Sequence, residues 1–332
     1  MKNVLVLGSS GAMGQYIVPY LSDMGYFVTA VSLDDEKPYS SQVECIKGNV
    51  KEMDFLKSLL DRKYDGVVDF MNYYEDFTPY CELFLKSTDH YIFLSSCRIY
   101  ANEEWPIKET SPRLLEVSTD KELLASNDYC IYKAKQEDIL RNSGKTNWTI
   151  VRPATTFAKM RYQLVTLEAT NVVGRAKRGK KVVVPIEAKD KPATLSWAGD
   201  VSMMIAKLLF NDRAYGDTFN VCSAESKTWG EIAQYYNKIA GLQAVWVDKE
   251  DYLKILRPNV PLPVRWQLEY ARLFNRITDN SKVLEVTGMK QENLMSMFDA
   301  LKFAVESAPE GYVFPENSID ERMDEYLEKM NL

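Results

Sequence analysis

The chain has 332 residues, of which 46% are hydrophobic and 27% charged, and these fractions exclude a disordered or fibrous protein. Its 41 Lys and Arg residues stand against 47 Asp and Glu residues, and the formal net charge of −6 argues against a broad nucleic-acid-binding surface. Five Cys residues without a Cys-x-x-Cys pair and a single His predict no metal centre and a reducing, cytoplasmic compartment. No segment approaches the about 18 apolar residues that span a bilayer, so we expect no membrane association.

Short apolar runs alternate with segments of helical spacing in the first part of the chain. The runs that predict buried parallel strands lie at residues 4–7, 28–33, 67–70 and 91–94. A long helix over 127–141 and a strand at 148–151 follow, and a later strand at 218–221 is expected to return to the sheet. This alternation predicts an α/β fold, a Rossmann-type doubly wound parallel sheet.

In the second part of the chain, predicted strands and helices alternate less regularly. Residues 161–181 carry a helical pattern that ends in a basic run, interpreted as a solvated helix terminus that the helix dipole favours. We expect residues 1–155 to form a dinucleotide-binding domain, with 190–223 returning to its sheet. Residues 156–189 and 224–332 are then expected to form a smaller, mixed substrate-binding lobe.

A glycine loop follows the first predicted strand and opens a helix, which is the context that dinucleotide binding requires. Gly8 permits the tight turn, Gly11 lets backbone N–H groups approach a pyrophosphate, and Gly14 lets the helix pack closely on the strand. The anion is expected to lie against the helix N-terminus, where unpaired N–H groups and the helix dipole favour it.

The Gly-x-x-Gly-x-x-Gly spacing resembles the extended branch of the short-chain dehydrogenase/reductase superfamily, the NAD-dependent epimerase/dehydratase family. Further motifs of that family follow in order over nearly the whole chain. They are similar to Gly48-Asn49-Val50, Ser95-Ser96 with Tyr100, Tyr129-x-x-x-Lys133 with Glu137, Arg152-Pro153, and Asp279-Asn280-Ser281-Lys282.

Tyr129 and Lys133 are four residues apart, so on a helix they share one face. An ammonium group beside a phenol lowers the phenol pKa, which makes the tyrosine a better general base. The resemblance implies that Tyr129, Lys133 and Ser96 are catalytic, that Lys133 also binds the nicotinamide ribose, and that Ser96 holds the substrate oxygen.

The resemblance also implies two sets of binding residues. The cofactor set is Gly8, Ser10, Gly11, Ala12, Met13, Gly14, Ser32, Asn49, Val50, Lys133, Pro153 and Ala154. The substrate set is Ser96, Tyr129, Thr155, Arg265 and Arg272, with Arg276 as a further candidate phosphate ligand. Ser32 stands where NAD enzymes of the family usually have Asp, but the following Asp34 and Asp35 would repel a 2′-phosphate. NAD is therefore the expected cofactor, with NADP as the alternative.

The family resemblance implies an NAD(P)-dependent epimerase of a nucleotide-linked sugar, with C4 epimerisation favoured, that forms a homodimer. An NAD(P)H-dependent ketoreductase acting on a sugar or another small carbonyl compound is the alternative. A dehydratase is less favoured, because Cys97 and Arg98 replace the Asp-Glu pair of that branch. A non-catalytic nucleotide-sensing or RNA-binding protein is also less favoured. Residues 68–73 resemble a chloroplast stem-loop RNA-binding group, but the acidic charge and the Ser96, Tyr129 and Lys133 set argue against nucleic acid.

Overall fold

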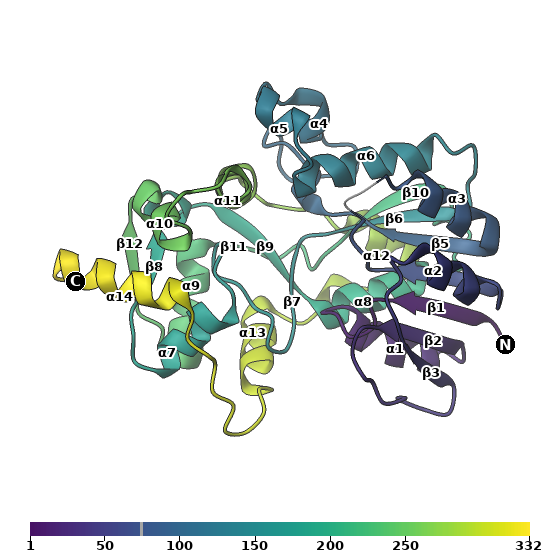
Figure 1. Ribbon diagram of the computed structural model, residues 1–332, viewed down its shortest axis with the longest axis horizontal. Helices are drawn as coiled ribbons and strands as arrows, with labels where there is room; N and C mark the ends of the chain where they lie inside the picture. Colours follow the sequence, from purple (N-terminus) through teal and green to yellow (C-terminus); the bar gives the residue numbers. More distant parts are fainter. Residues whose placement is uncertain (74–75) are drawn as a thin grey trace.

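The computed structural model describes residues 1–73 and 76–332, which form two lobes side by side along the long axis (Figure 1). The N-terminus lies at the outer end of the larger lobe, and the C-terminal helix lies at the far end of the smaller lobe. No helix in the described ranges is long and apolar enough to cross a membrane.

A seven-stranded sheet, in which every neighbouring pair is parallel, forms the centre of the larger lobe. Its spatial order is β10-β6-β5-β4-β1-β2-β3. The strands are β1 (Asn3–Leu7), β2 (Phe27–Ser32), β3 (Val43–Lys47), β4 (Tyr64–Asp69), β5 (Thr88–Leu94), β6 (Trp148–Pro153) and β10 (Asp217–Val221). The chain moves outward from β1 to β3 and then returns to the other side of β1, so the strand order reverses between β1 and β4. Parallel sheets bind ligands beyond the carboxyl ends of the strands at such a reversal.

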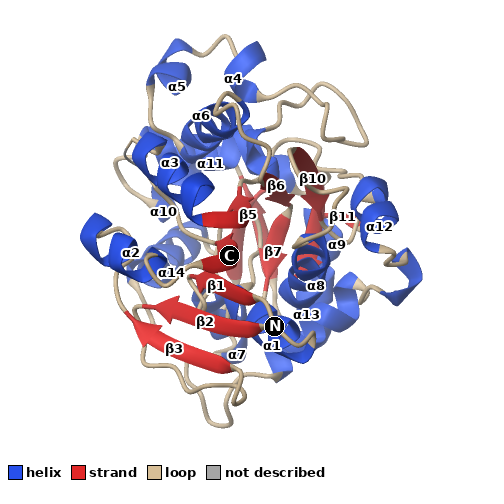
Figure 2. Cartoon of the chain, turned by 90° about the vertical axis from the view of Figure 1, so that its right-hand side faces the viewer, coloured by secondary structure: helices blue, strands red, loops and turns tan. Residues whose placement is uncertain are grey.

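Helices cover both faces of this sheet, which confirms the Rossmann-type α/β prediction (Figure 2). One face packs against α1 (Gly14–Asp23), α8 (Ala198–Leu208) and α12 (Ser281–Thr287). The other packs against α2 (Met53–Leu60), α3 (Thr78–Ser87) and α6 (Tyr129–Arg141). The short helices η1 (Cys97–Ile99), α4 (Leu114–Val117) and α5 (Lys121–Ala125) lead from β5 to α6.

The smaller lobe has its own apolar core and two small sheets. The first contains β7 (Thr155–Phe157), β9 (Pro192–Trp197) and β11 (Ser226–Thr228), and the second pairs β8 (Val182–Pro185) with β12 (Ala244–Val247). Its helices are η2 (Thr170–Gly174), α7 (Arg175–Lys177), η3 (Ile186–Ala188), α9 (Trp229–Ala240), α10 (Lys249–Leu256), α11 (Leu262–Gln267), η4 (Leu268–Arg272), η5 (Gln291–Asn293), α13 (Met297–Glu306) and α14 (Ser318–Met330). The segment 190–223 thus supplies β10 to the main sheet, whereas its β9 pairs with β7.

The basic run that ends at residue 181 does not form the solvated helix terminus that the sequence predicts. Helical structure begins only at Thr170, and Arg175 is fully buried. The Arg175 guanidinium contacts the carboxylates of Asp320 at 3.3 Å and Asp324 at 2.6 Å. The interpretation was wrong because the acidic partners lie on α14, about 145 residues further along the chain, where local periodicity carries no information about them.

Candidate active site

The glycine loop between β1 and α1 is shaped by close approach of the backbone. Gly8 has a φ of +82°, and its N–H donates a hydrogen bond to the Val31 carbonyl at 2.9 Å. A Cβ atom on Gly14 would lie 2.3 Å from the Ser9 carbonyl oxygen, so no side chain fits there. The loop therefore has the positive φ and the tight helix packing that a dinucleotide-binding turn needs.

A cavity of about 390 Å³ opens above this loop. It brings together Gly8, residues 10–14, Ser32, Asn49 and Val50, all of which the sequence predicts as cofactor ligands. The predicted ligands Pro153 and Ala154 border a different cavity, and Lys133 borders neither. The residues predicted to bind the cofactor therefore do not lie at one cavity. One group borders the glycine-loop cavity, and Pro153 and Ala154 border the cavity that contains Ser96 and Tyr129.

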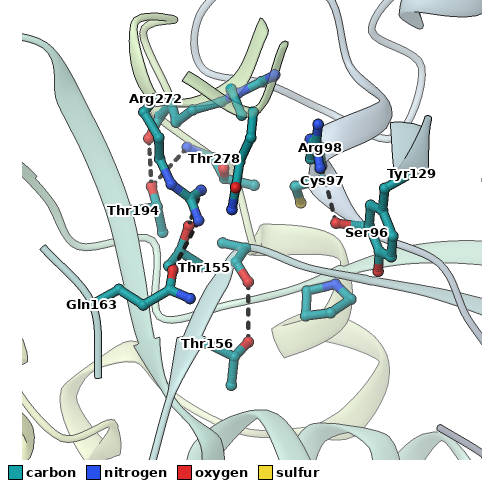
Figure 3. A pocket seen from close by; sticks show the side chains of 15 residues that line it. Ser96, Cys97, Arg98, Tyr129, Thr155, Thr156, Gln163, Thr194, Arg272 and Thr278 are labelled. Atoms are coloured by element: carbon teal, nitrogen blue, oxygen red, sulfur yellow. Dashed lines mark hydrogen bonds between the residues drawn. The ribbon is translucent and has the colours of Figure 1, made fainter. Parts of the chain in front are cut away.

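The second cavity, of about 310 Å³, lies between the two lobes. Ser96 and Tyr129 lie on one side of it, and Arg272 points toward Thr155 and Gln163 on the other (Figure 3). One cavity thus contains four of the predicted residues, Ser96, Tyr129, Thr155 and Arg272, although they come from four separate parts of the chain.

Ser96 and Tyr129 are placed by the ends of β5 and α6. The Ser96 hydroxyl accepts a hydrogen bond from the backbone N–H of Arg98 at 3.1 Å. Tyr129 is the first residue of α6, and the preceding Asp128 caps that helix by accepting from the Cys130 N–H at 3.1 Å. The guanidinium of Arg98 donates to both Asp128 oxygens, at 2.9 and 3.1 Å, and so links the Ser96 turn to the start of the tyrosine helix.

Lys133, one turn further along α6 than Tyr129, is fully buried. Its ammonium donates to the Leu94 carbonyl at 2.7 Å and to the Met71 carbonyl at 3.3 Å. Burial lowers the pKa of Lys133 to about 8, against the opposing effect of the Asp69 and Glu137 carboxylates. The ammonium therefore stays mostly charged at neutral pH and connects the end of β5, which leads to Ser96, with the β4 loop at the cofactor cavity.

Asp69 is the buried acid that faces Lys133. One carboxylate oxygen accepts from the Met71 N–H at 2.9 Å, and the other accepts from the Tyr91 hydroxyl at 2.7 Å. Burial raises the pKa of Asp69 to about 6, although these hydrogen bonds and the Lys133 charge oppose the shift. Asp69 and Lys133 thus hold the N–H and C=O groups of Met71, a residue that forms part of the cofactor cavity wall.

Two half-buried arginines, Arg272 and Arg276, give the second cavity a positive charge. Arg272 donates to the Val165 carbonyl at 2.8 Å, to Thr155 at 3.0 Å and to Gln163 at 2.8 Å, all of them neutral acceptors. Burial first, and then repulsion between neighbouring guanidinium groups, lowers the pKa of both Arg272 and Arg276 to about 10. Neither has a carboxylate within ion-pair distance in the described part of the chain, so an anion in the cavity would compensate a half-buried positive charge.

Arg265, the other predicted substrate ligand, does not border this cavity. Its guanidinium contacts Glu250 at 2.7 Å and Glu269 at 3.1 Å on the smaller lobe. Sequence reasoning gave no binding role to several residues that border the cavity, because they come from separate elements and loops and belong to none of the motifs to which binding roles were given. These are Arg98, Gln163, Thr194, Gln267 and Thr278. Within residues 1–73 and 76–332, no group of three His, Cys, Asp or Glu residues is arranged to hold a metal ion.

The fold is similar to that of solved sugar epimerases. An epimerase from Methanothermobacter thermautotrophicus has a TM-score of 0.69 at 14% identity, over 99% of this chain and 94% of that one. UDP-glucuronic acid 4-epimerase from Bacillus cereus, solved with UDP-glucuronic acid and NAD, has a TM-score of 0.66 at 14% identity, over 90% and 96% of the two chains. UDP-glucose 4-epimerase from Bifidobacterium longum, solved with NAD+ and UDP, has a TM-score of 0.65 at 19% identity, over 93% and 100%. The chain thus shares the Rossmann-type α/β fold of these solved epimerases.

The amino-acid sequence is similar to that of a protein named for stem-loop binding, not for epimerase activity. The chain is 24% identical over 256 residues to the chloroplast stem-loop binding protein of 41 kDa b from Arabidopsis thaliana. The match covers 72% of this chain and 64% of the length of that protein. No family model matches the chain. The fold is thus similar to that of solved epimerases, while the sequence similarity is to a protein named for stem-loop binding.

Proposed function

We propose that this protein is an NAD-dependent epimerase that inverts C4 of a nucleotide-linked sugar. The observation that carries the proposal is the cavity of about 310 Å³, which combines Ser96 and Tyr129 with two half-buried arginines, neither of which forms an ion pair within residues 1–73 and 76–332. A hydroxyl-activating pair and an anion site in one cavity suit a sugar that carries a phosphate group. The fold similarity to solved nucleotide-sugar epimerases supports the same substrate class.

The glycine loop and its cavity would hold NAD. The residues fit this group, because Gly8 adopts the positive φ of the tight turn, Gly14 allows close packing of α1, and Gly11 borders the cavity without a side chain that would keep a pyrophosphate from the backbone. Asp34 borders the same cavity near Ser32, and its carboxylate would accept hydrogen bonds from ribose hydroxyls and repel the 2′-phosphate of NADP. When bound, NAD supplies the hydride acceptor.

Tyr129 would take the proton from the sugar hydroxyl that is oxidised. The Lys133 ammonium, held charged at neutral pH, would stabilise the phenolate that does this. The Ser96 hydroxyl would donate a hydrogen bond to the same sugar oxygen and orient it toward Tyr129.

Arg272 and Arg276 would hold the diphosphate of the substrate by charge-assisted hydrogen bonds. Inversion at one carbon would require the oxidised sugar to turn its opposite face toward the hydride donor, and an anion fixed at one side of the cavity would give the sugar a pivot for that rotation. We also propose a homodimer paired through α6, because the family resemblance implies that arrangement.

The substitution Tyr129→Phe tests the proposal. We expect it to lower turnover of the nucleotide sugar by about 100-fold or more, the size typical of a lost general base, and to leave NAD affinity near that of the wild type. Tyr132→Phe, one turn further along α6 and not at the cavity, is the matched control and should retain turnover. Epimerisation assayed by chromatography of the sugar products is the measurement, and full activity of Tyr129→Phe would contradict the mechanism.

A further inference from the structure

The cofactor cavity is bordered by one residue from the smaller lobe. Every other described residue at this cavity lies between Gly8 and Met71, on the glycine loop or at the ends of β2, β3 and β4. Arg161 comes from the turn that follows β7, about 90 residues further along the chain, and meets the same space.

The turn that carries Arg161 is anchored at both ends. The backbone N–H of Ala158 donates to the Arg161 carbonyl at 2.8 Å, and the Arg161 N–H donates back to the Ala158 carbonyl at 3.0 Å. Ala158 and Tyr162, on either side, are fully buried in the core of the smaller lobe, and Met160 has a φ of +62°. These buried neighbours fix the backbone of the turn. The Arg161 side chain therefore extends to the glycine-loop cavity from a fixed backbone position.

Arg161 also supplies a charge that the rest of this cavity lacks. Among the described residues that border it, Arg161 is the one cation and Asp34 is the one acid. Arg161 forms no ion pair within residues 1–73 and 76–332, whereas Arg175 and Arg178 in the same lobe are paired with acids of α14. The glycine loop offers a pyrophosphate backbone N–H groups and a helix dipole, but no full positive charge.

We propose that Arg161 is a phosphate clamp, which binds the pyrophosphate of the dinucleotide from the smaller lobe and thereby ties the two lobes together when the cofactor is bound. A guanidinium forms charge-assisted hydrogen bonds to phosphate oxygens, which are about twice as strong as neutral ones. The inference rests on the proposed NAD binding at the glycine loop, and it adds a residue that the loop and its motif do not contain.

Binding titrations with Arg161→Gln test the clamp without an activity assay. We expect this variant to bind NAD and ADP about tenfold more weakly than the wild type, since a hydrogen bond to a charged group is lost. Adenosine, which has no phosphate, should bind both proteins equally. Arg161→Lys should recover part of the affinity, and Lys159→Gln, an exposed residue of the same turn that does not border the cavity, should bind all three ligands as the wild type does.

The outcomes separate this inference from the proposed function. Wild-type affinity of Arg161→Gln for NAD and ADP would overturn the clamp and leave the NAD site intact. Equal weakening of NAD and adenosine would also overturn it, because the side chain would then act as a cavity wall and not as a phosphate ligand. A selective loss of NADP affinity with NAD unchanged would assign Arg161 to a ribose phosphate and contradict the pyrophosphate assignment. A wild-type protein that binds neither NAD nor ADP would overturn the proposed function itself.

Discussion

At the scale of single residues, the proposed chemistry of the site depends on a buried carboxyl group and a buried amine. Asp69 ends β4 and Lys133 lies on α6, and both form hydrogen bonds with the backbone of Met71. Burial shifts their pKa values toward neutrality, to about 8 for the ammonium and about 6 for the carboxylic acid. The charge available to stabilise a Tyr129 phenolate therefore depends on pH within the range in which enzymes are assayed.

We expect turnover to fall as the pH rises above about 8, because Lys133 then loses its proton and the phenolate loses its positive neighbour. The Asp69 carboxylate raises the Lys133 pKa, so Asp69→Asn should move this alkaline limb to lower pH. A pH profile of kcat for the two proteins is the measurement. Asp65→Asn, at the opposite end of β4, should leave the limb in place, and an unchanged or higher limb in Asp69→Asn would contradict the role given to the pair.

Site residues that belong to a recognisable sequence motif could be predicted, and site residues outside such motifs were missed. Ser96 could be chosen over Ser95 by its distance from Tyr100, and the structure places Ser96 at the cavity and Ser95 in the fully buried core. Asp69 has no such signal, because one acid at a strand end is common and its importance comes from burial beside Lys133. Arg265 and Arg272 looked equivalent in sequence, and only tertiary contacts show that Glu250 and Glu269 bind the first.

At the scale of elements, the start of α6 sets the position of Tyr129. Asp128 is buried and makes two kinds of contact, a helix cap to the Cys130 N–H and an ion pair with Arg98. The capping residue is therefore joined to the turn that carries Ser96. A change that loosens the first turn of α6 is therefore expected to displace both Tyr129 and Ser96, the two side chains proposed as catalytic.

Two substitutions at Asp128 separate the cap from the ion pair. Asn is a good cap, so Asp128→Asn removes only the charge, whereas Asp128→Ala removes both. We expect the free energy of unfolding of the Ala variant to be lower than that of the Asn variant by about 1 kcal/mol, the usual value of a helix cap. Chemical denaturation measures this difference, and equal stabilities would show that Asp128 does not cap α6.

Strand prediction worked where the strand is mostly buried, including the edge strand β10, and failed at the partly exposed edge strand β3. All the predicted strands lie within β1, β2, β4, β5, β6 and β10 or overlap them by most of their length. The edge strand β3 is only partly buried and lacks a continuous apolar run, so hydrophobic patterning did not identify it. The short strands of the smaller lobe have three to six residues each, too few for their pattern to stand out from a loop.

At the scale of the whole molecule, charge argues against a broad nucleic-acid-binding surface. The net charge is −6, and three residues of the basic run, Arg175, Arg178 and Lys180, form ion pairs with acids of α14. Arg178 contacts Asp320 at 3.2 Å, and Lys180 contacts Asp324 at 2.7 Å. The cluster that would best suit a phosphate backbone is thus neutralised within the molecule.

We therefore expect no salt-sensitive complex with RNA, despite the similarity to a protein named for stem-loop binding. A gel-shift titration with a structured RNA at several salt concentrations is the measurement. Protein–RNA complexes that rely on phosphate contacts weaken steeply as salt rises. A complex with that salt dependence would contradict the charge argument and favour a binding function for the fold.

The retained cofactor is the most direct test of the central claim. An epimerase must regenerate its oxidised cofactor in every cycle, so it can keep the dinucleotide bound through purification. Denaturing the freshly purified protein and identifying the released nucleotide by mass spectrometry should yield NAD at close to one molecule per chain. A protein that releases no nucleotide, and that does not take up NAD when titrated with it, would contradict the account.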